Sequence, residues 1–240
     1  MSNPAQTGPR RGRAYREQSR QAATSKQEIQ ARYERGARHY DFVLQLYRLI
    51  GLRLEAYRSR AVECLRLKPG DCVVELGCGT GLNFPLLIEQ IGSQGRVIGV
   101  DLSTEMLACA RERAERAGWS NVELVQSDIA TYDIPQGVNG VLSTGAFGFV
   151  PAYDRVIKRA LHALASRGRL VILDCKRPEH WPFWLLKLFV WVSRPFGLTF
   201  DYFDGHPWES VERFFEETAL EEMYGGLVYI SSGTVPSSTV

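Results

Sequence analysis

The chain has 240 residues, of which 45% are hydrophobic and 23% are charged, and its formal net charge is +2. These proportions are ordinary for a globular protein with a buried core, and the length suits one α/β domain with additions. No stretch reaches the roughly 18 consecutive apolar residues that a bilayer-spanning helix needs, so we expect no transmembrane helix.

The charge of the chain is unevenly distributed. The first 40 residues hold nine Arg or Lys and three Glu, so they carry +6 and the other 200 residues carry −4 in total. Residues 1–27 contain almost no large apolar side chains and are predicted to form a disordered basic tail. Such a tail is either a solvated extension or a segment attracted to an anionic membrane. Because its only aromatic residue is Tyr15 and the body is acidic, no nucleic-acid partner is expected.

The cysteines and the N-terminus bear on the cellular location. Five cysteines without a C-x-x-C pair indicate reduced thiols rather than a disulfide framework, and they give no reason to expect a metal site. The first 40 residues lack the apolar segment of a signal peptide. We therefore expect a cytoplasmic protein, with peripheral membrane contact as an option that the basic tail leaves open.

Residues 28–67 form the next predicted unit, which is mostly helical. The run from Phe42 to Ile50 is apolar enough to pack on a core, and Gly51 is expected to end its helix. A second helix is expected from about Leu54 to Leu65. Residues 68–235 are then predicted to form the core domain, which starts with a turn before its first strand.

The stretch Val73–Gly81 reads as a buried strand that runs into a glycine-rich turn. Glycines at 77, 79 and 81 allow a sharp turn and a close approach of another group to the backbone. The apolar run that follows predicts a helix, whose first N–H groups are free and carry partial positive charge. A strand, a glycine turn and a helix together predict a nucleotide-cofactor site. The spacing is G-x-G-x-G, whereas a nicotinamide-binding turn has G-x-G-x-x-G.

Acidic residues follow the next two predicted strands. The strand Arg96–Val100 ends in Asp101, about 20 residues past the glycines, where a carboxylate accepts hydrogen bonds from ribose hydroxyls. Ser103 is predicted to cap the following helix. The strand Val122–Gln126 leads into Asp128, a loop acid that on its own pattern is a cap of its loop.

On these motifs the chain resembles the class I S-adenosylmethionine-dependent methyltransferases, over about residues 30–232. The resemblance implies an α/β fold with a Rossmann-like seven-stranded mixed sheet, parallel except for an antiparallel edge hairpin, with helices on both faces. Further strands are expected at Val138–Ser143 and Arg169–Asp174, and Leu220–Ile230 resembles the closing hairpin.

The resemblance also implies the cofactor, S-adenosyl-L-methionine, with S-adenosyl-L-homocysteine as product. The glycine loop would pass beside the methionine part, and residues after the second and third strands would surround the ribose and adenine. The residues implied to bind the cofactor are Tyr33, Glu75, Gly77, Cys78, Gly79, Thr80, Gly81, Asn83, Asp101, Leu102, Met106, Ser127, Asp128, Ile129, Ser143 and Thr144.

The acceptor side of the site is predicted from three other segments. Arg32–Asp41 resembles the R-Y-x-x-x-A-x-x-Y-D motif of many small-molecule methyltransferases, whose N-terminal helices fold over the cofactor. By that resemblance Tyr33 and Tyr40 line the acceptor pocket, although both could be ordinary packing residues. Tyr40 or Tyr153 could orient the acceptor, and His206 and His180 are the candidate general bases.

Residues 176–208 form an aromatic-rich insertion. Trp181–Val192 is apolar on nearly every side except at Lys187, so its helix is expected either to be buried or to contact lipid. The lipid interpretation agrees with similarity to the ubiquinone/menaquinone C-methyltransferases and to a phospholipid N-methyltransferase-like branch.

The expected function is therefore methyl transfer to an amphipathic acceptor, a phospholipid amine or a prenylated quinone-type ring. Methylation of a small soluble metabolite is the alternative within this family. A non-catalytic S-adenosylmethionine-binding protein is the alternative from another class.

Overall fold

The computed structural model describes residues 51–194 and 197–236. The strands are β1 (Cys72–Leu76), β2 (Arg96–Asp101), β3 (Val122–Gln126), β4 (Val138–Thr144), β5 (Leu164–Cys175), β6 (Glu216–Met223) and β7 (Val228–Thr234). The α-helices are α2 (Leu54–Cys64), α3 (Phe84–Ile91), α4 (Thr104–Ala117), α5 (Tyr153–Ala163), α6 (Phe183–Ser193) and α7 (Pro207–Phe214). Two short 3-10 helices are η2 (Phe147–Phe149) and η4 (Phe200–Phe203).

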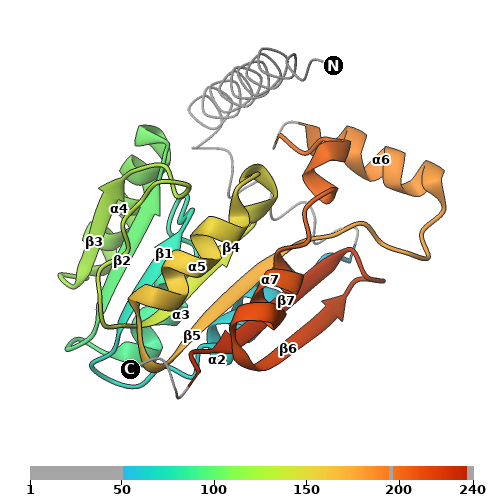
Figure 1. Cartoon of the computed structure of the whole chain (residues 1–240). Coiled ribbons are helices and arrows are strands. Elements are labelled where there is room, and N and C mark those ends of the chain that lie inside the picture. Colours follow the sequence, from blue (N-terminus) through green and yellow to red (C-terminus); the bar gives the residue numbers. More distant parts are fainter. Residues whose placement is uncertain (1–50, 195–196, 237–240) are drawn as a thin grey trace, which may run out of the picture.

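The seven strands form one mixed sheet in the order β3-β2-β1-β4-β5-β7-β6 (Figure 1). Neighbouring strands from β3 to β5 are parallel, whereas β7 is antiparallel to both β5 and β6. The predicted fold class, with its antiparallel hairpin at one edge, is confirmed. In a sheet of this kind the carboxyl ends of the parallel strands lie at one edge, which is where ligands bind.

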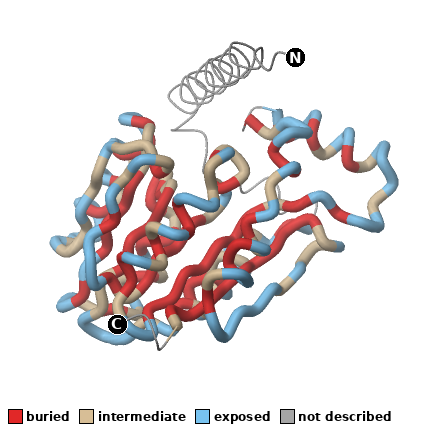
Figure 2. The backbone as a smooth tube through the Cα atoms, viewed as in Figure 1, coloured by how far each residue is buried: buried red, intermediate tan, exposed pale blue. Residues whose placement is uncertain are grey.

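Two apolar layers cover the two faces of the sheet. Alternation along β1 sends Val73 to one face and Val74 and Leu76 to the other, and all three are buried. One layer includes residues of α2, α3 and α4, and the other includes residues of α5 and α7. In Figure 2 the buried residues follow the strands through the middle of the molecule. The central strands are thus packed between two apolar layers, which also fix the positions of the strand ends.

The strands at the hairpin side differ from their predicted limits. β5 begins at Leu164, five residues before the expected Arg169, because Leu164 pairs with Val138 beyond an irregularity in the register between β4 and β5. β6 begins at Glu216 and has a similar irregularity before Ala219. Pairing with neighbouring strands extends both segments through residues whose local pattern does not indicate a strand.

The helix of the aromatic insertion is buried on one face only. α6 buries Leu186, Val190 and Ser193, while its opposite face is exposed to solvent (Figures 1 and 2). In the part of the chain that the structure describes, no helix is both long and apolar enough to cross a bilayer. The predicted tail at 1–27 and the residues 28–50 of the N-terminal unit lie outside the described residues, whereas α2 packs against α3, β4 and β5.

Candidate functional site

The glycine turn after β1 has the conformation that the sequence predicts. Gly77, Gly79 and Gly81 all have positive φ angles, of 75°, 54° and 74°. A Cβ on Gly77 would lie 2.5 Å from the Cβ of Ala146, and one on Gly81 would lie 2.6 Å from the ring of Phe84. A Cβ on Gly79 would meet none of the described residues within 4 Å. Two of the glycines are therefore required by the protein's own packing, and the third has free space on the side of the described residues.

The turn is anchored to its neighbours by backbone hydrogen bonds. The N–H groups of Gly77 and Cys78 both donate to the carbonyl of Val100 in β2, at 2.8 and 3.0 Å. The carbonyl of Thr80 accepts a bond of 2.9 Å from Nε of Arg113 in α4. Burial raises the pKa of the Cys78 thiol well above its usual value, so this cysteine is a neutral packing residue.

A buried polar cluster lies directly beneath the turn. The side-chain amide of Asn83 donates to Oε1 of Glu75 at 2.5 Å and to Oγ1 of Thr144 at 3.0 Å. Ser143 donates to the carbonyl of Leu76 at 2.8 Å, which links the ends of β4 and β1. Burial raises the pKa of Glu75 to about 8, because the loss of water outweighs the Asn83 hydrogen bond and the charge of Arg58, which both lower it. Four predicted site residues thus meet here: Glu75, Asn83, Ser143 and Thr144.

Asn83 is implied to bind the cofactor, but its amide hydrogens are not free to do so. Both hydrogens of its amide group are already engaged by Glu75 and Thr144. What remains is the acceptor atom Oδ1, which is buried and has no partner among the described residues. Oε2 of Glu75 is in the same condition. The cluster therefore offers a donor from outside the acceptor Oδ1 of Asn83, together with Oε2 of Glu75 once that carboxyl group is ionised.

Asp101 lies at the end of β2, with its carboxylate turned toward the glycine turn. Oδ2 accepts a bond of 2.8 Å from the N–H of Gly79, and Oδ1 accepts one of 2.9 Å from the N–H of Ser103. Burial raises its pKa, while these backbone bonds act in the opposite direction. Ser103 caps α4 as predicted, since its side chain accepts from the N–H of Met106. Met106 is buried and Leu102 is half-buried.

The segment after β3 is built as a tight turn. Oδ1 of Asp128 accepts a bond of 2.8 Å from the N–H of Ala130, so this oxygen caps its own loop. Arg159 of α5 binds the carbonyls of Ile129 and Ala130, at 3.1 and 2.6 Å. The N–H of Ser127 donates to the carbonyl of Asp101 at 3.0 Å. The loop that is predicted to flank the adenine is thereby fixed beside β2.

These residues fit an S-adenosylmethionine molecule. Its ammonium group is a cationic donor, and the buried acceptors of Glu75 and Asn83 lack a donor among the described residues. Its ribose hydroxyls are donors, which suits the carboxylate of Asp101 at a neighbouring strand end. The open space over Gly79 allows a ligand to approach the backbone between the two. Among the described residues no group of His, Cys, Asp and Glu is arranged to hold a metal ion.

Of the residues predicted to contact the acceptor, only Tyr153 is found to line a cavity among the described residues. Tyr153 lines a cavity of about 230 Å³ between η2, η4 and the start of α7, together with Phe147, Tyr202 and Tyr229. The imidazole of His206 is exposed and lies edge-on to Trp208, with ring centroids 4.9 Å apart, and His206 contributes only its backbone N–H to the hydroxyl of Tyr153. Its predicted role as general base therefore gains no support from the geometry. Tyr33 and Tyr40 lie outside the described residues.

Asp174 is a carboxylate at this edge that the sequence analysis missed. It lies in β5, beside the cavity, and accepts bonds from the N–H groups of Phe147, Gly148 and Cys175 and from the hydroxyl of Tyr202. Burial raises its pKa to about 6, against the opposing effect of those four donors. Its position at a strand end, like that of Asp101, is the sequence signal that could have identified it.

Comparison with known proteins places this geometry in context. A family model described as a methyltransferase domain matches residues 67–190. The chain is 32% identical over 193 residues to a 2-phytyl-1,4-naphtoquinone methyltransferase of Thermosynechococcus vestitus, covering 78% of this chain and 83% of the relative. It is 27% identical over 217 residues to a demethylmenaquinone methyltransferase of Listeria welshimeri, covering 86% and 90%.

A solved structure supports the fold alone. The structure of a geranyl diphosphate methyltransferase in complex with GPP and sinefungin matches with a TM-score of 0.57 at 15% identity. The match covers 76% of this chain and 77% of the other.

Proposed function

We propose that this chain, which belongs to the class I S-adenosylmethionine-dependent methyltransferases, methylates the ring of a prenylated quinone-type acceptor that it takes from a membrane surface. S-Adenosylmethionine is the cofactor of the family, and it supplies an activated methyl group when bound.

The observation that carries the proposal is an exposed apolar surface on the insertion. We call it the α6 apolar face, and it consists of Phe183, Trp184, Leu188, Trp191, Val192 and Phe200, each at least 42% exposed. Trp184 and Trp191 are 66% and 64% exposed. Soluble proteins rarely leave so many large apolar side chains together in water, and such a surface indicates a partner or a membrane. Tryptophans at the edge of an apolar helix suit the headgroup region of a bilayer.

The charges beside this face are compatible with an anionic membrane. Nζ of Lys187 lies 4.5 Å from the centre of the Phe183 ring, so the ammonium is carried on the exposed side of α6. No acidic residue lies within Phe183–Ser193. An interfacial helix with lysine and tryptophan on its outer side is attracted to anionic lipid and inserts only to the depth of the headgroups.

The relatives support the ring acceptor over the phospholipid amine. Both are named for naphthoquinone- or menaquinone-type substrates, and both are matched over more than 80% of their lengths. A prenylated ring has a long apolar tail, so an enzyme that takes it from a membrane needs an apolar contact with lipid. The α6 apolar face is an exposed surface that can make this contact with lipid.

The residues of the site have two tasks in this reaction. Glu75, Asn83 and Asp101 hold the cofactor in one orientation, which replaces a chance encounter by a fixed approach of the acceptor. A ring carbon becomes a good nucleophile when the neighbouring ring hydroxyl loses its proton. The cavity beside this strand edge is lined by Tyr153, Tyr202 and Tyr229 and by the acids Asp201 and Asp204, and Asp174 accepts the hydroxyl of Tyr202 next to it. Tyr153 and the Asp174–Tyr202 pair can orient a ring hydroxyl there.

The acceptor can be identified by methyl transfer from labelled S-adenosylmethionine into a total cell extract. We expect label in the organic phase, on a quinone-type ring that separates from phospholipids by chromatography. Label on a phospholipid headgroup would mean that the acceptor is an amine and not a ring. The aromatic side chains around η4 could then contact the cationic amine through their ring faces. Label found only in the aqueous phase would contradict a membrane-derived acceptor altogether.

A further inference from the structure

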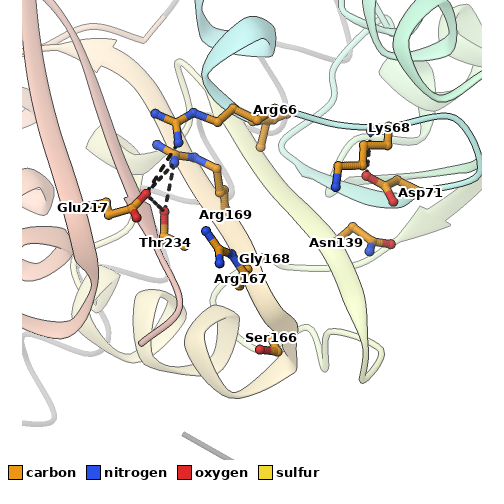
Figure 3. A pocket seen from close by; sticks show the side chains of 11 residues that line it. Arg66, Lys68, Asp71, Asn139, Ser166, Arg167, Gly168, Arg169, Glu217 and Thr234 are labelled. Atoms are coloured by element: carbon orange, nitrogen blue, oxygen red, sulfur yellow. Dashed lines mark hydrogen bonds and ion pairs between the residues drawn. The ribbon is translucent and has the colours of Figure 1, made fainter. Parts of the chain in front are cut away.

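A second pocket, about 330 Å³ in volume, lies at the opposite edge of the sheet from the glycine turn. It is formed where α2 ends, where β4 and β5 begin and where β7 ends, so it is at the amino ends of the parallel strands. Six charged residues line it: Arg66, Lys68, Asp71, Arg167, Arg169 and Glu217 (Figure 3). We call it the arginine pocket. It shares no residue with the methyl-transfer site.

The arginine pocket has an excess of positive charge. Four cationic side chains line it against two carboxylates. Oε2 of Glu217 is shared between the guanidinium groups of Arg66 and Arg169, at 3.5 and 3.8 Å. Arg167 has no ion-pair partner within residues 51–194 and 197–236. One carboxylate therefore serves two guanidinium groups that lie side by side, and a third cation is close by (Figure 3).

Arg169 is unusually buried for a charged residue. It is 6% exposed, and its guanidinium donates to Oγ1 of Thr234 at 2.9 Å and to Oγ of Ser232 at 3.4 Å. Its Nε is buried and has no hydrogen-bond partner in the described part of the chain. Burial and the nearby charge of Arg66 both lower the pKa of Arg169. A buried arginine normally has its donors satisfied, so this one lacks an acceptor.

Backbone strain is concentrated at the same place. Four described residues other than glycine have positive φ angles, and three of them line the arginine pocket: Arg66 at 53°, Arg167 at 62° and Glu217 at 46°. Such conformations are unfavourable for residues with a Cβ, and they persist where the surrounding structure requires them. Here they direct three long charged side chains from three separate segments toward one cavity.

We propose that the arginine pocket binds a phosphate monoester. The planar fork of a guanidinium group matches two oxygens of a phosphate, and a dianion supplies the negative charge that the pocket lacks. The volume exceeds that of a phosphate group alone, so the rest of a small phosphorylated molecule fits beside it. Because α6 follows the carboxyl end of β5, the pocket lies at the other edge from the α6 apolar face. A free phosphorylated metabolite is thus favoured over a lipid headgroup.

Calorimetric titration of the full chain, at constant ionic strength, tests the proposal. The probes are inorganic phosphate and glycerol 3-phosphate, and vesicles containing phosphatidic acid present the same group on a lipid. We expect binding of the soluble monoester, and a loss of about tenfold or more in affinity for Arg66→Asn with Arg167→Asn, because each removes a charge-assisted contact. Asparagine tolerates the left-handed conformation, so the double variant keeps the backbone.

Arg111→Gln is the matched control, since Arg111 is an exposed arginine of α4 outside the pocket. It should bind the monoester as the wild type does, and both variants should keep their affinity for S-adenosylhomocysteine. Binding to vesicles but to neither soluble probe would assign the same pocket to a lipid headgroup. The proposal is overturned if no probe binds, or if the double variant binds the monoester as tightly as the Arg111 control.

Discussion

The hydroxyl of Tyr202 donates a hydrogen bond to Oδ1 of Asp174, and this bond joins the aromatic insertion to the sheet. The other oxygen of Asp174 accepts from the N–H groups of Phe147 and Gly148 in η2, at 3.0 and 3.3 Å. The ring of Tyr202 also lies edge-on to Phe149, with centroids 4.8 Å apart. One buried carboxylate thus holds together the end of β5, the loop after β4 and η4.

Replacing Tyr202 by Phe should loosen this junction without abolishing the fold. The substitution keeps the ring contacts and removes one donor from a buried carboxylate, so we expect a loss of about 1–3 kcal/mol in the free energy of unfolding. The pKa of Asp174, about 6, should rise further, because the Tyr202 bond now lowers it. Urea denaturation measures the first effect.

Tyr57→Phe provides the control for that experiment. Tyr57 is a partly buried tyrosine of α2, and its hydroxyl makes no hydrogen bond with the described residues. Its substitution should change stability by less than about 0.5 kcal/mol. Equal losses for the two variants would mean that the Tyr202 hydroxyl adds nothing to the anchoring of the insertion.

The buried carboxyl group of Glu75 should make the unliganded protein less stable as the pH rises. Its pKa is raised to about 8 in the folded chain, against 4.5 when it is free. Between these values the folded state holds a proton that the unfolded state has lost, so the free energy of unfolding falls with increasing pH, by at most about 1.4 kcal/mol per unit. Denaturation of wild type and Glu75→Gln at pH 5.5, 7 and 8 checks this, because the free energy of unfolding of the glutamine variant should fall less steeply with pH. If it falls equally steeply in both proteins, Glu75 does not cause the loss of stability.

The conformation of the glycine turn and the place of Asp101 at a strand end were predictable from the sequence, and the reason is local. Gly77 and Asp101 each belong to a short segment whose conformation follows from a strand and the turn after it. The Asp174–Tyr202 bond spans 28 residues, and Tyr202 comes from an insertion for which no spacing rule exists. In the same way Arg66 and Glu217 meet only because 151 residues of chain bring two irregular segments together.

The insertion illustrates a second limit of sequence reasoning. Its apolar composition predicted a helix that is either buried or in contact with lipid, and composition alone does not choose between these outcomes. The structure divides the helix, with Leu186 and Val190 on the core and Trp184 and Trp191 outside. That division depends on the tertiary packing of Leu186 and Val190 in the apolar cluster, which no local pattern encodes.

Asp101 can be tested by substitution with Ala. Its carboxylate braces Gly79 and Ser103 and is the predicted acceptor for the ribose hydroxyls, so we expect about 1–3 kcal/mol less binding free energy for S-adenosylhomocysteine. Calorimetric titration gives the value directly. Asp133→Ala, at an exposed acid in the loop before β4, should leave the affinity unchanged. An Asp101 variant with wild-type affinity would remove this residue from the cofactor site.

Membrane contact through the α6 apolar face can be tested by flotation with anionic liposomes. Trp184→Glu together with Trp191→Glu places two carboxylates on that face, where desolvation and repulsion from anionic lipid oppose binding. We expect the wild type to float and the double variant to remain in the dense fraction, with equal affinity for S-adenosylhomocysteine. Leu220→Glu, at an exposed apolar residue of the edge strand β6, is the matched control and should float as the wild type does. If the wild type does not float, α6 does not bind the membrane surface, and its exposed tryptophans then require a protein partner or a soluble acceptor to cover them.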